Sequence, residues 1–282
     1  MKDTCIGSVQ MVSGECVATN LQQAYALVSQ AVDRGAQLVL LPENFAHLAD
    51  GGSFSAAETF ARGDACSEQQ PVQFALQSWC REFGIWIAAG AVSLLQRPDG
   101  IAVPDRRCRS AFLLYDDRGE LNARYDKMHL FDVEVDDTAG RYRESATIEA
   151  GDTPVVASTP WAKLGLSICF DLRFPELYRE LAMAGAELLL VPAAFTHTTG
   201  KAHWMTLLQA RAIENGCFVI AAGQGGQHSP KRRTWGHSAI IDPWGEILAE
   251  ADEGEAVITA TLNAEKLNRV RKDMPLLSMR RL

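Results

Sequence analysis

Three side chains that could carry chemistry follow predicted strands of this 282-residue sequence. Glu43 comes after the apolar run QLVLLP, Lys127 after ELNARYD, and Cys169 after LGLSI. Ligands of open α/β folds bind beyond the carboxyl ends of strands, so these positions are candidates for a site. A thiol, a carboxylate and an ammonium can together supply a nucleophile, a general base and a partner for an oxyanion.

Cys169 is predicted to lie between a strand and a helix that begins near Pro175, a residue favoured at the first helical position. A tight turn there would expose the thiol beside free backbone N–H groups, as in a nucleophile elbow. The positive end of a helix favours the thiolate, and the N–H of Phe170 can receive an oxyanion. The alternative is that Cys169 is a small buried apolar residue at the end of a strand.

Glu43 and Lys127 are each open to two interpretations. Pro42 and Phe45 would partly remove the Glu43 carboxyl from water, which would raise its pKa toward the range that suits a general base. Lys127, between Asp126 and an apolar segment, would be a fixed cation that favours a thiolate and stabilises an oxyanion. Each residue alone is equally compatible with an exposed, solvated charge.

Segments of strand and helix character alternate along the chain, which indicates an α/β fold. Asn20 is predicted to cap a helix that ends at Gly35. A second helix follows Pro71 and ends at Gly84. Strands are expected at 37–41 and 85–89, and a hairpin at 112–115 and 120–125.

The same order of segments occurs twice, which predicts an internal repeat. Two similar halves would pack face to face as a four-layer α-β-β-α sandwich with a pseudo-twofold axis. The alternative is that both halves share only the Gly and Pro punctuation common in α/β proteins. The matching segments are GAQLVLLP (35–42) with GAELLLVP (185–192), IWIAAGA (85–91) with CFVIAAG (217–223), and the hairpins 113–121 with 240–248.

Two further segments, 49–70 and 132–153, are rich in Gly, Asp, Ser and Thr and are predicted to be long loops. Loops of this length in a compact domain usually serve a function.

Composition excludes several classes of protein. The net charge of −8 disfavours a nucleic-acid or anionic-membrane surface, and no apolar run approaches the roughly 20 residues of a membrane span. Seven widely spaced cysteines without a C-x-x-C pair disfavour a disulfide framework and a structural zinc, and favour a cytoplasmic location. The six histidines form no short metal-binding pair, so no metal is expected.

Three strings resemble the glutamate, lysine and cysteine motifs of the nitrilase superfamily of carbon-nitrogen hydrolases. They are LLPENF (41–46), YDKMHLFDVEV (125–135) and SICFDLRFPELYRELAMAGAELLLVPAAF (167–195). Their order and separations suit that family. The resemblance implies one carbon-nitrogen hydrolase domain over residues 1–282, an α-β-β-α sandwich, no cofactor, and a homodimer or larger homo-oligomer.

The resemblance also implies a role for each motif residue. Cys169 would attack an amide carbonyl while Glu43 accepts the thiol proton, and Lys127 and the Phe170 N–H would hold the oxyanion. Glu43 would then protonate the leaving amine and activate the water that releases the acid from a thioester. Glu144, in RYRES, fits the position of a further glutamate that orients Lys127 and the substrate amide.

Further strings resemble the Nit branch of the superfamily: THTTGKAHW (196–204), the segment 207–228, and RTWGHSAIIDPWG (233–245). That branch implies a small amide substrate that bears a carboxylate on a 2-oxoglutarate skeleton. Deaminated glutathione, cleaved to 2-oxoglutarate and cysteinylglycine, is favoured. The alternatives are omega-amidase, N-carbamoyl amino acid amidohydrolase or nitrilase activity, or a scaffold protein that keeps only the fold.

Arg173 is the expected partner of the substrate carboxylate, because a guanidinium binds a carboxylate through two hydrogen bonds. Phe195 and Thr196 are expected beside it in the substrate site. The alternative for Arg173 is an ion pair with Glu176.

Two other possibilities remain open from sequence. The basic run 231–233 is either a site for a second substrate carboxylate or a solvated turn. A protease-like dyad of Cys169 with His197 or His203 is also conceivable.

Overall fold

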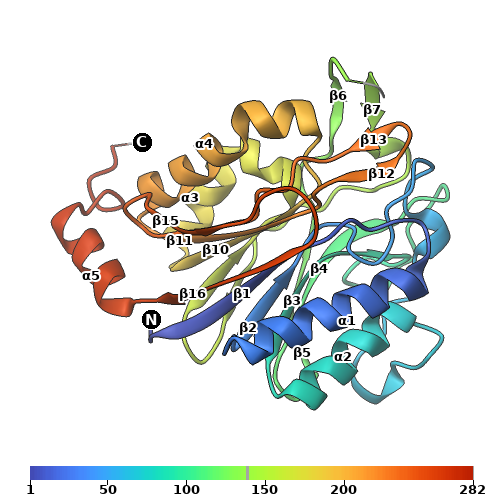
Figure 1. Ribbon diagram of the computed structural model, residues 1–282, viewed down its shortest axis with the longest axis horizontal. Coiled ribbons are helices and arrows are strands. Elements are labelled where there is room, and N and C mark those ends of the chain that lie inside the picture. Colours follow the sequence, from blue (N-terminus) through green and yellow to red (C-terminus); the bar gives the residue numbers. More distant parts are fainter. Residues whose placement is uncertain (138–139, 282) are drawn as a thin grey trace.

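The chain folds into two stacked sheets with helices on their outer faces, as Figure 1 shows for the computed structural model, which describes residues 1–137 and 140–281. The first sheet has the order β16 (Ala256–Leu262), β1 (Thr4–Gln10), β2 (Leu38–Leu41), β3 (Trp86–Leu94), β4 (Arg109–Tyr115) and β5 (Leu121–Asp126). The second has the order β15 (Ile247–Glu250), β14 (Ala239–Ile241), β11 (Phe218–Gly223), β10 (Leu188–Ala193), β9 (Lys163–Leu166) and β8 (Val156–Ser158).

Each sheet has its own pair of helices. The first sheet packs against α1 (Val17–Asp33) and α2 (Pro71–Phe83). The second packs against α3 (Pro175–Met183) and α4 (His197–Asn215), and α5 (Ala264–Asp273) follows β16. The predicted α-β-β-α sandwich is therefore confirmed.

The predicted internal repeat is also confirmed by the pairing of strands. In the first sheet β1, β2 and β3 are parallel, and β4 and β5 continue antiparallel. In the second sheet β9, β10 and β11 are parallel, and β14 and β15 continue antiparallel. One further antiparallel strand completes each sheet, β16 beside β1 and β8 beside β9.

The two sheets are in close contact where β3 faces β10. Every residue of β2 and of β10 is buried, as expected for parallel strands covered on both faces. At Gly90 an added Cβ would lie 2.1 Å from the Cβ of Pro192 and 2.7 Å from the carbonyl oxygen of Leu41. Only glycine fits this contact, which holds the strand ends of the two halves together.

The predictions for the helix boundaries are right in four cases and wrong in one. The second helix begins at Pro71 and ends at Gly84, whose φ of 64° is left-handed, and α3 begins at Pro175. The first helix also stops just before Gly35. Asn20, however, is not its N-cap, because α1 already begins at Val17.

Asn20 instead holds two loops together from inside the first turn of α1. Its side-chain oxygen accepts from the Gly14 N–H at 2.9 Å, and its Nδ2 donates to the carbonyls of Gly14 and Ala46 at 2.7 and 2.9 Å. The polar side chain that suggested a cap therefore fixes the segment that follows Glu43.

The two predicted loops contain short elements. The structure has η1 (Phe54–Ala56) and η2 (Gly63–Ala65) in the first, and β6 (Asp132–Glu134), β7 (Arg141–Arg143) and η3 (Glu144–Ala146) in the second. Residues 138 and 139 of the second segment lie outside the described residues. None of the helices in the described ranges is long and apolar enough to cross a membrane.

Candidate active site

A cavity of about 300 Å³ lies where the ends of strands from both sheets meet, and it contains the three motif side chains. Glu43 and Lys127 come from the first sheet, after β2 and β5, whereas Cys169 follows β9 of the second. The volume is at the lower limit of typical small-ligand pockets. Both predicted loop segments contribute to the wall, with residues 49–53, 141–144 and 147–148.

Cys169 lies in a tight turn, as the elbow comparison predicted. Its φ of 50° is in the left-handed region, which costs a residue other than glycine on the order of 1–3 kcal/mol. The turn is the start of η4 (Cys169–Arg173), a short 3₁₀ helix that precedes α3 and that the sequence analysis missed. Because Phe170 is its second residue, the Phe170 N–H has no acceptor within η4 and is available beside the thiol.

Glu43 is buried, with 3% of its surface exposed, and it has hydrogen-bond donors on both carboxylate oxygens. Oε1 accepts from Lys127 Nζ at 2.8 Å, and Oε2 accepts from the Ala194 N–H at 2.9 Å. The Cys169 thiol lies near the same carboxylate, and the two groups shift each other's pKa. Gln224 fixes the backbone, since its Nε2 donates to the Glu43 carbonyl at 3.1 Å.

The expectation of a raised pKa at Glu43 is wrong. Burial does act to raise the pKa of Glu43, but the Lys127 ammonium and the hydrogen bonds from Cys169 and Lys127 outweigh it, so the pKa lies below its ordinary value. Glu43 is therefore a carboxylate at neutral pH and can accept a proton.

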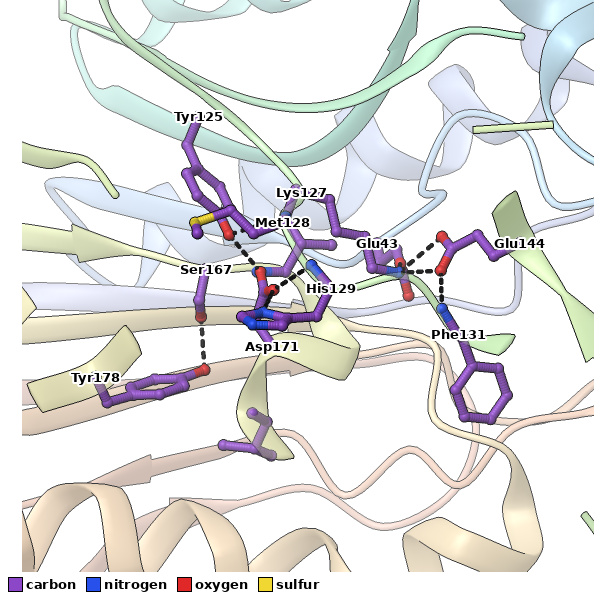
Figure 2. Close-up of polar contacts among 12 residues, drawn as sticks. Glu43, Tyr125, Lys127, Met128, His129, Phe131, Glu144, Ser167, Asp171 and Tyr178 are labelled. Atoms are coloured by element: carbon purple, nitrogen blue, oxygen red, sulfur yellow. Dashed lines mark hydrogen bonds and ion pairs between the residues drawn. The ribbon is translucent and has the colours of Figure 1, made fainter. Parts of the chain in front are cut away.

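Lys127 lies between two carboxylates (Figure 2). Its Nζ is 2.8 Å from Glu43 Oε1, and it is 2.8 and 2.9 Å from the two oxygens of Glu144. Burial opposes the charged form, but the charges of Glu144 and Glu43 hold the pKa of Lys127 well above its ordinary value. The cation is thus permanent, although only 2% of Lys127 is exposed.

Glu144 is fixed by a second donor, because its Oε2 also accepts from the Phe131 N–H at 2.6 Å. Its pKa is raised, chiefly by removal from water, although Lys127 acts in the opposite direction. Glu43 and Glu144 therefore share one ammonium, and both line the cavity that contains the Cys169 thiol.

Cys169 is a thiol in this environment, which corrects the expectation that the helix start would favour a thiolate. Burial and the neighbouring Glu43 carboxylate raise the pKa of Cys169 well above its ordinary value, more than Lys127 lowers it. The five residues of η4 do not offset the loss of solvation. Any reaction of the sulfur as a nucleophile must therefore transfer its proton as it reacts, and Glu43 is the nearby carboxylate that can receive it.

A buried carboxylate, Asp171, joins the turn that carries Cys169 to the segment that carries Lys127 (Figure 2). Asp171 is fully buried and accepts from the Ile168 N–H at 2.8 Å and from the Tyr125 hydroxyl at 2.7 Å. It also contacts the N–H and Nδ1 of His129, at 3.1 and 2.7 Å. The sequence analysis missed this residue, since nothing in CFDLRF separates it from an ordinary aspartate beside a turn.

Arg173, Phe195 and Thr196 line the cavity where the sequence analysis expected a substrate site. The Arg173 guanidinium lies 5.1 Å from the ring centre of Phe195, and its Nη1 is 3.2 Å from Nδ1 of His203. Within the described ranges no ion pair joins Arg173 to Glu176, so the alternative interpretation of Arg173 is wrong. A guanidinium without a carboxylate partner faces the cavity.

The two histidines considered as partners of Cys169, His197 and His203, interact with other residues. His197 pairs with Glu253 at 3.3 Å, and His203 contacts Arg173, so neither is seen beside the thiol. Across residues 1–137 and 140–281, no group of three or more His, Cys, Asp or Glu side chains could hold a metal ion.

The three residues of the basic run 231–233 have different surroundings. Lys231 is exposed, and Arg233 pairs with Glu253 at 2.7 Å. Arg232 lines the cavity. Only one of the three residues therefore belongs to the site.

Comparison with known proteins shows the family to which the chain belongs. The sequence matches the carbon-nitrogen hydrolase family over residues 5–272. It is 45% identical to the deaminated glutathione amidase of Synechocystis sp., over 99% of both chains.

Solved structures are similar as well. Nit3 of Saccharomyces cerevisiae, a member of branch 10 of the nitrilase superfamily, aligns with a TM-score of 0.86 and 27% identity, over 100% of this chain and 97% of Nit3. A glutamate-to-glutamine mutant of the amidase from Nesterenkonia sp. AN1 aligns with a TM-score of 0.78 and 26% identity, over 99% and 94% of the two chains. That structure shows the acetamide moiety of fluoroacetamide added covalently at the active-site cysteine.

The protonation state of Cys169 can be measured directly. We expect the ultraviolet absorbance of its thiolate, taken as the difference between the unmodified protein and Cys169→Ala, to be absent at pH 7. Because the pKa is raised, the signal should grow only above the ordinary thiol value of about 8.5. The other six cysteines cancel in the difference. A thiolate signal already present at pH 7 would contradict the assignment.

Proposed function

The chain belongs to the carbon-nitrogen hydrolase family and is an amide hydrolase, and from this premise we propose that it hydrolyses deaminated glutathione through a thioester on Cys169. One observation supports this above the others. The Glu43 carboxylate is paired with the Lys127 ammonium, and both groups line one cavity with Cys169, whose thiol is near enough to Glu43 for each to shift the other's pKa. A base, a nucleophile and a fixed cation thus meet at one point.

Acylation follows from these contacts. Glu43 takes the proton of Sγ as the sulfur attacks the amide carbonyl carbon. The carbonyl oxygen gains negative charge, which Lys127 Nζ and the Phe170 N–H stabilise. As the C–N bond breaks, Glu43 passes the proton to the leaving nitrogen, and a thioester remains on Cys169.

Deacylation uses the same carboxylate again. After the amine leaves, Glu43 accepts a proton from a water molecule, which attacks the thioester carbonyl. The oxyanion forms in the same place, and the C–S bond breaks as the proton returns to Sγ. The products are a free carboxylic acid and a thiol ready for another cycle.

Glu144 has a positioning role in this proposal. Its two short contacts to Lys127 keep the ammonium from pairing with Glu43 alone. Such exclusive pairing would make Glu43 a weaker base and would turn Nζ away from the oxyanion. The hydrogen bond from the Phe131 N–H holds Glu144 in place for this task.

Arg173 would bind the carboxylate of the 2-oxo acid, at the end of the cavity that Phe195 and Thr196 also line. Burial lowers the pKa of Arg173, although the group remains a cation at neutral pH. Binding an anion there would replace lost solvation with two charge-assisted hydrogen bonds. The name of the 45%-identical relative from Synechocystis supports the same substrate.

We also propose that the protein is one domain over residues 1–282, located in the cytoplasm, and works as a homodimer or larger assembly. The two halves share one continuous core, which supports a single domain. All seven cysteines are unpaired, which suits a reducing compartment.

The assembly is tested by sedimentation, which should show a mass of at least two chains. A stable monomer would contradict the proposed homo-oligomer.

The substrate is tested by comparing kcat/KM for deaminated glutathione, 2-oxoglutaramate, a carbamoyl amino acid and a simple nitrile. Deaminated glutathione should be the best substrate.

Cys169→Ala should lower the kcat/KM for deaminated glutathione by about 10⁴-fold or more, because the nucleophile is gone. Arg173→Met should raise KM by about tenfold or more, since a charge-assisted pair is lost.

The outcomes separate the competing functions. A preference for 2-oxoglutaramate would indicate an omega-amidase. Turnover of the nitrile alone would indicate a nitrilase, and turnover of the carbamoyl compound alone would indicate an N-carbamoyl amino acid amidohydrolase. Activity that survives in Cys169→Ala would contradict the mechanism. Folding of that variant is checked by its circular dichroism, so that loss of activity is not mistaken for loss of structure.

A further inference from the structure

We infer that Arg232 binds the carboxylate of the leaving group and so selects amides whose amine product is itself an acid. The inference rests on the proposed function and extends it to the other side of the scissile bond. Cleavage of deaminated glutathione releases an amine that ends in a glycine carboxylate, whereas 2-oxoglutaramate releases ammonia. A cation on the leaving-group side would distinguish the two.

Arg232 is carried by a short two-stranded ribbon, β12 (Gln227–Ser229) and β13 (Arg232–Arg233), that lies outside both sheets. The base of the ribbon is fixed to the fold by His228, whose Nδ1 is 2.7 Å from the Ser13 carbonyl and whose Nε2 is 2.6 Å from Thr234 Oγ1. The Arg232 side chain is half-buried and reaches the cavity wall. The ribbon therefore fixes the backbone of Arg232 beside the cavity.

The guanidinium of Arg232 has no acidic partner among the ion pairs of the described residues, unlike that of its neighbour Arg233. Its charge nevertheless extends to the catalytic centre, where it is among the groups that lower the pKa of Glu43. Its charge also acts on Tyr142 of β7, which lines the same cavity. A half-buried cation on the cavity wall, without an acidic partner among the ion pairs of the described residues, is placed to meet an incoming anion.

The balance of charge in the cavity fits a substrate with two carboxylates. The described residues that line it include cationic side chains at Lys127, Arg141, Arg143, Arg173 and Arg232, and acidic ones at Glu43, Asp50 and Glu144. The cations thus exceed the acids by two. Deaminated glutathione brings two carboxylates, one for Arg173 and one for a second cation, whereas 2-oxoglutaramate brings only one.

Arg232 fits this second carboxylate better than the arginines of β7. Arg143 donates to the Tyr142 carbonyl at 2.9 Å and lies 3.7 Å from Glu134, and it is exposed. Arg141 is exposed as well. A half-buried guanidinium binds an anion more strongly than an exposed one, because water screens the pair less.

The test is the selectivity of Arg232→Met, measured as the ratio of kcat/KM for deaminated glutathione to that for 2-oxoglutaramate. The ratio should fall about tenfold or more, mainly through a higher KM for deaminated glutathione. An analogue of deaminated glutathione with a terminal carboxamide should lose this sensitivity, so that the unmodified protein and the variant differ little on it. Lys231→Gln, on the same ribbon but outside the cavity, is the matched control and should keep the ratio of the unmodified protein.

Each of the following results would overturn the inference. Equal losses on both substrates would show that Arg232 acts only through its charge on Glu43. A lower ratio in Arg141→Met with an unchanged ratio in Arg232→Met would place the carboxylate at β7. Failure of the unmodified protein to hydrolyse deaminated glutathione would remove the proposed function and this inference together, whereas turnover with an unchanged ratio would remove this inference alone.

Discussion

The sharing of one buried ammonium by two carboxylates is the constraint on which the site depends. Lys127 is almost wholly removed from water, so its charge persists only because Glu43 and Glu144 both contact it at 2.8 Å. Breaking a buried pair by removal of one partner leaves an uncompensated charge, which is strongly unfavourable. The arrangement therefore keeps Glu43 ionised next to a neutral thiol, and the reactive ion pair forms only as bonds change.

The fold serves to bring these groups together from two sheets. Glu43 and Lys127 follow strands of the first half, whereas Cys169 and the Ala194 N–H follow strands of the second. The close packing of β3 on β10 brings the strand ends of the halves to one place, and Asp171 ties the cysteine turn to the lysine segment. The internal repeat thus has a chemical consequence, because neither half alone contains the base and the nucleophile.

Much of this could be predicted from sequence, and the errors share a physical cause. Strand ends, helix boundaries at proline and glycine, and the doubled order of segments are local signals, and they hold in the structure. The wrong predictions, an N-cap at Asn20, a raised pKa at Glu43 and a thiolate at Cys169, each depend on partners remote in sequence. Asp171 was missed for the same reason, since three of its four donor groups lie over 40 residues away.

If hydrolysis proceeds through a thioester on Cys169, every amide that yields 2-oxoglutarate must form the same acyl-enzyme. Partitioning of this intermediate between water and hydroxylamine is the most direct test. Hydroxylamine competes with water for the thioester. The ratio of hydroxamate to acid is therefore determined by the acyl-enzyme and does not depend on which amine has already left. The same ratio is expected from deaminated glutathione and from 2-oxoglutaramate. Different ratios, or no hydroxamate from either, would contradict it.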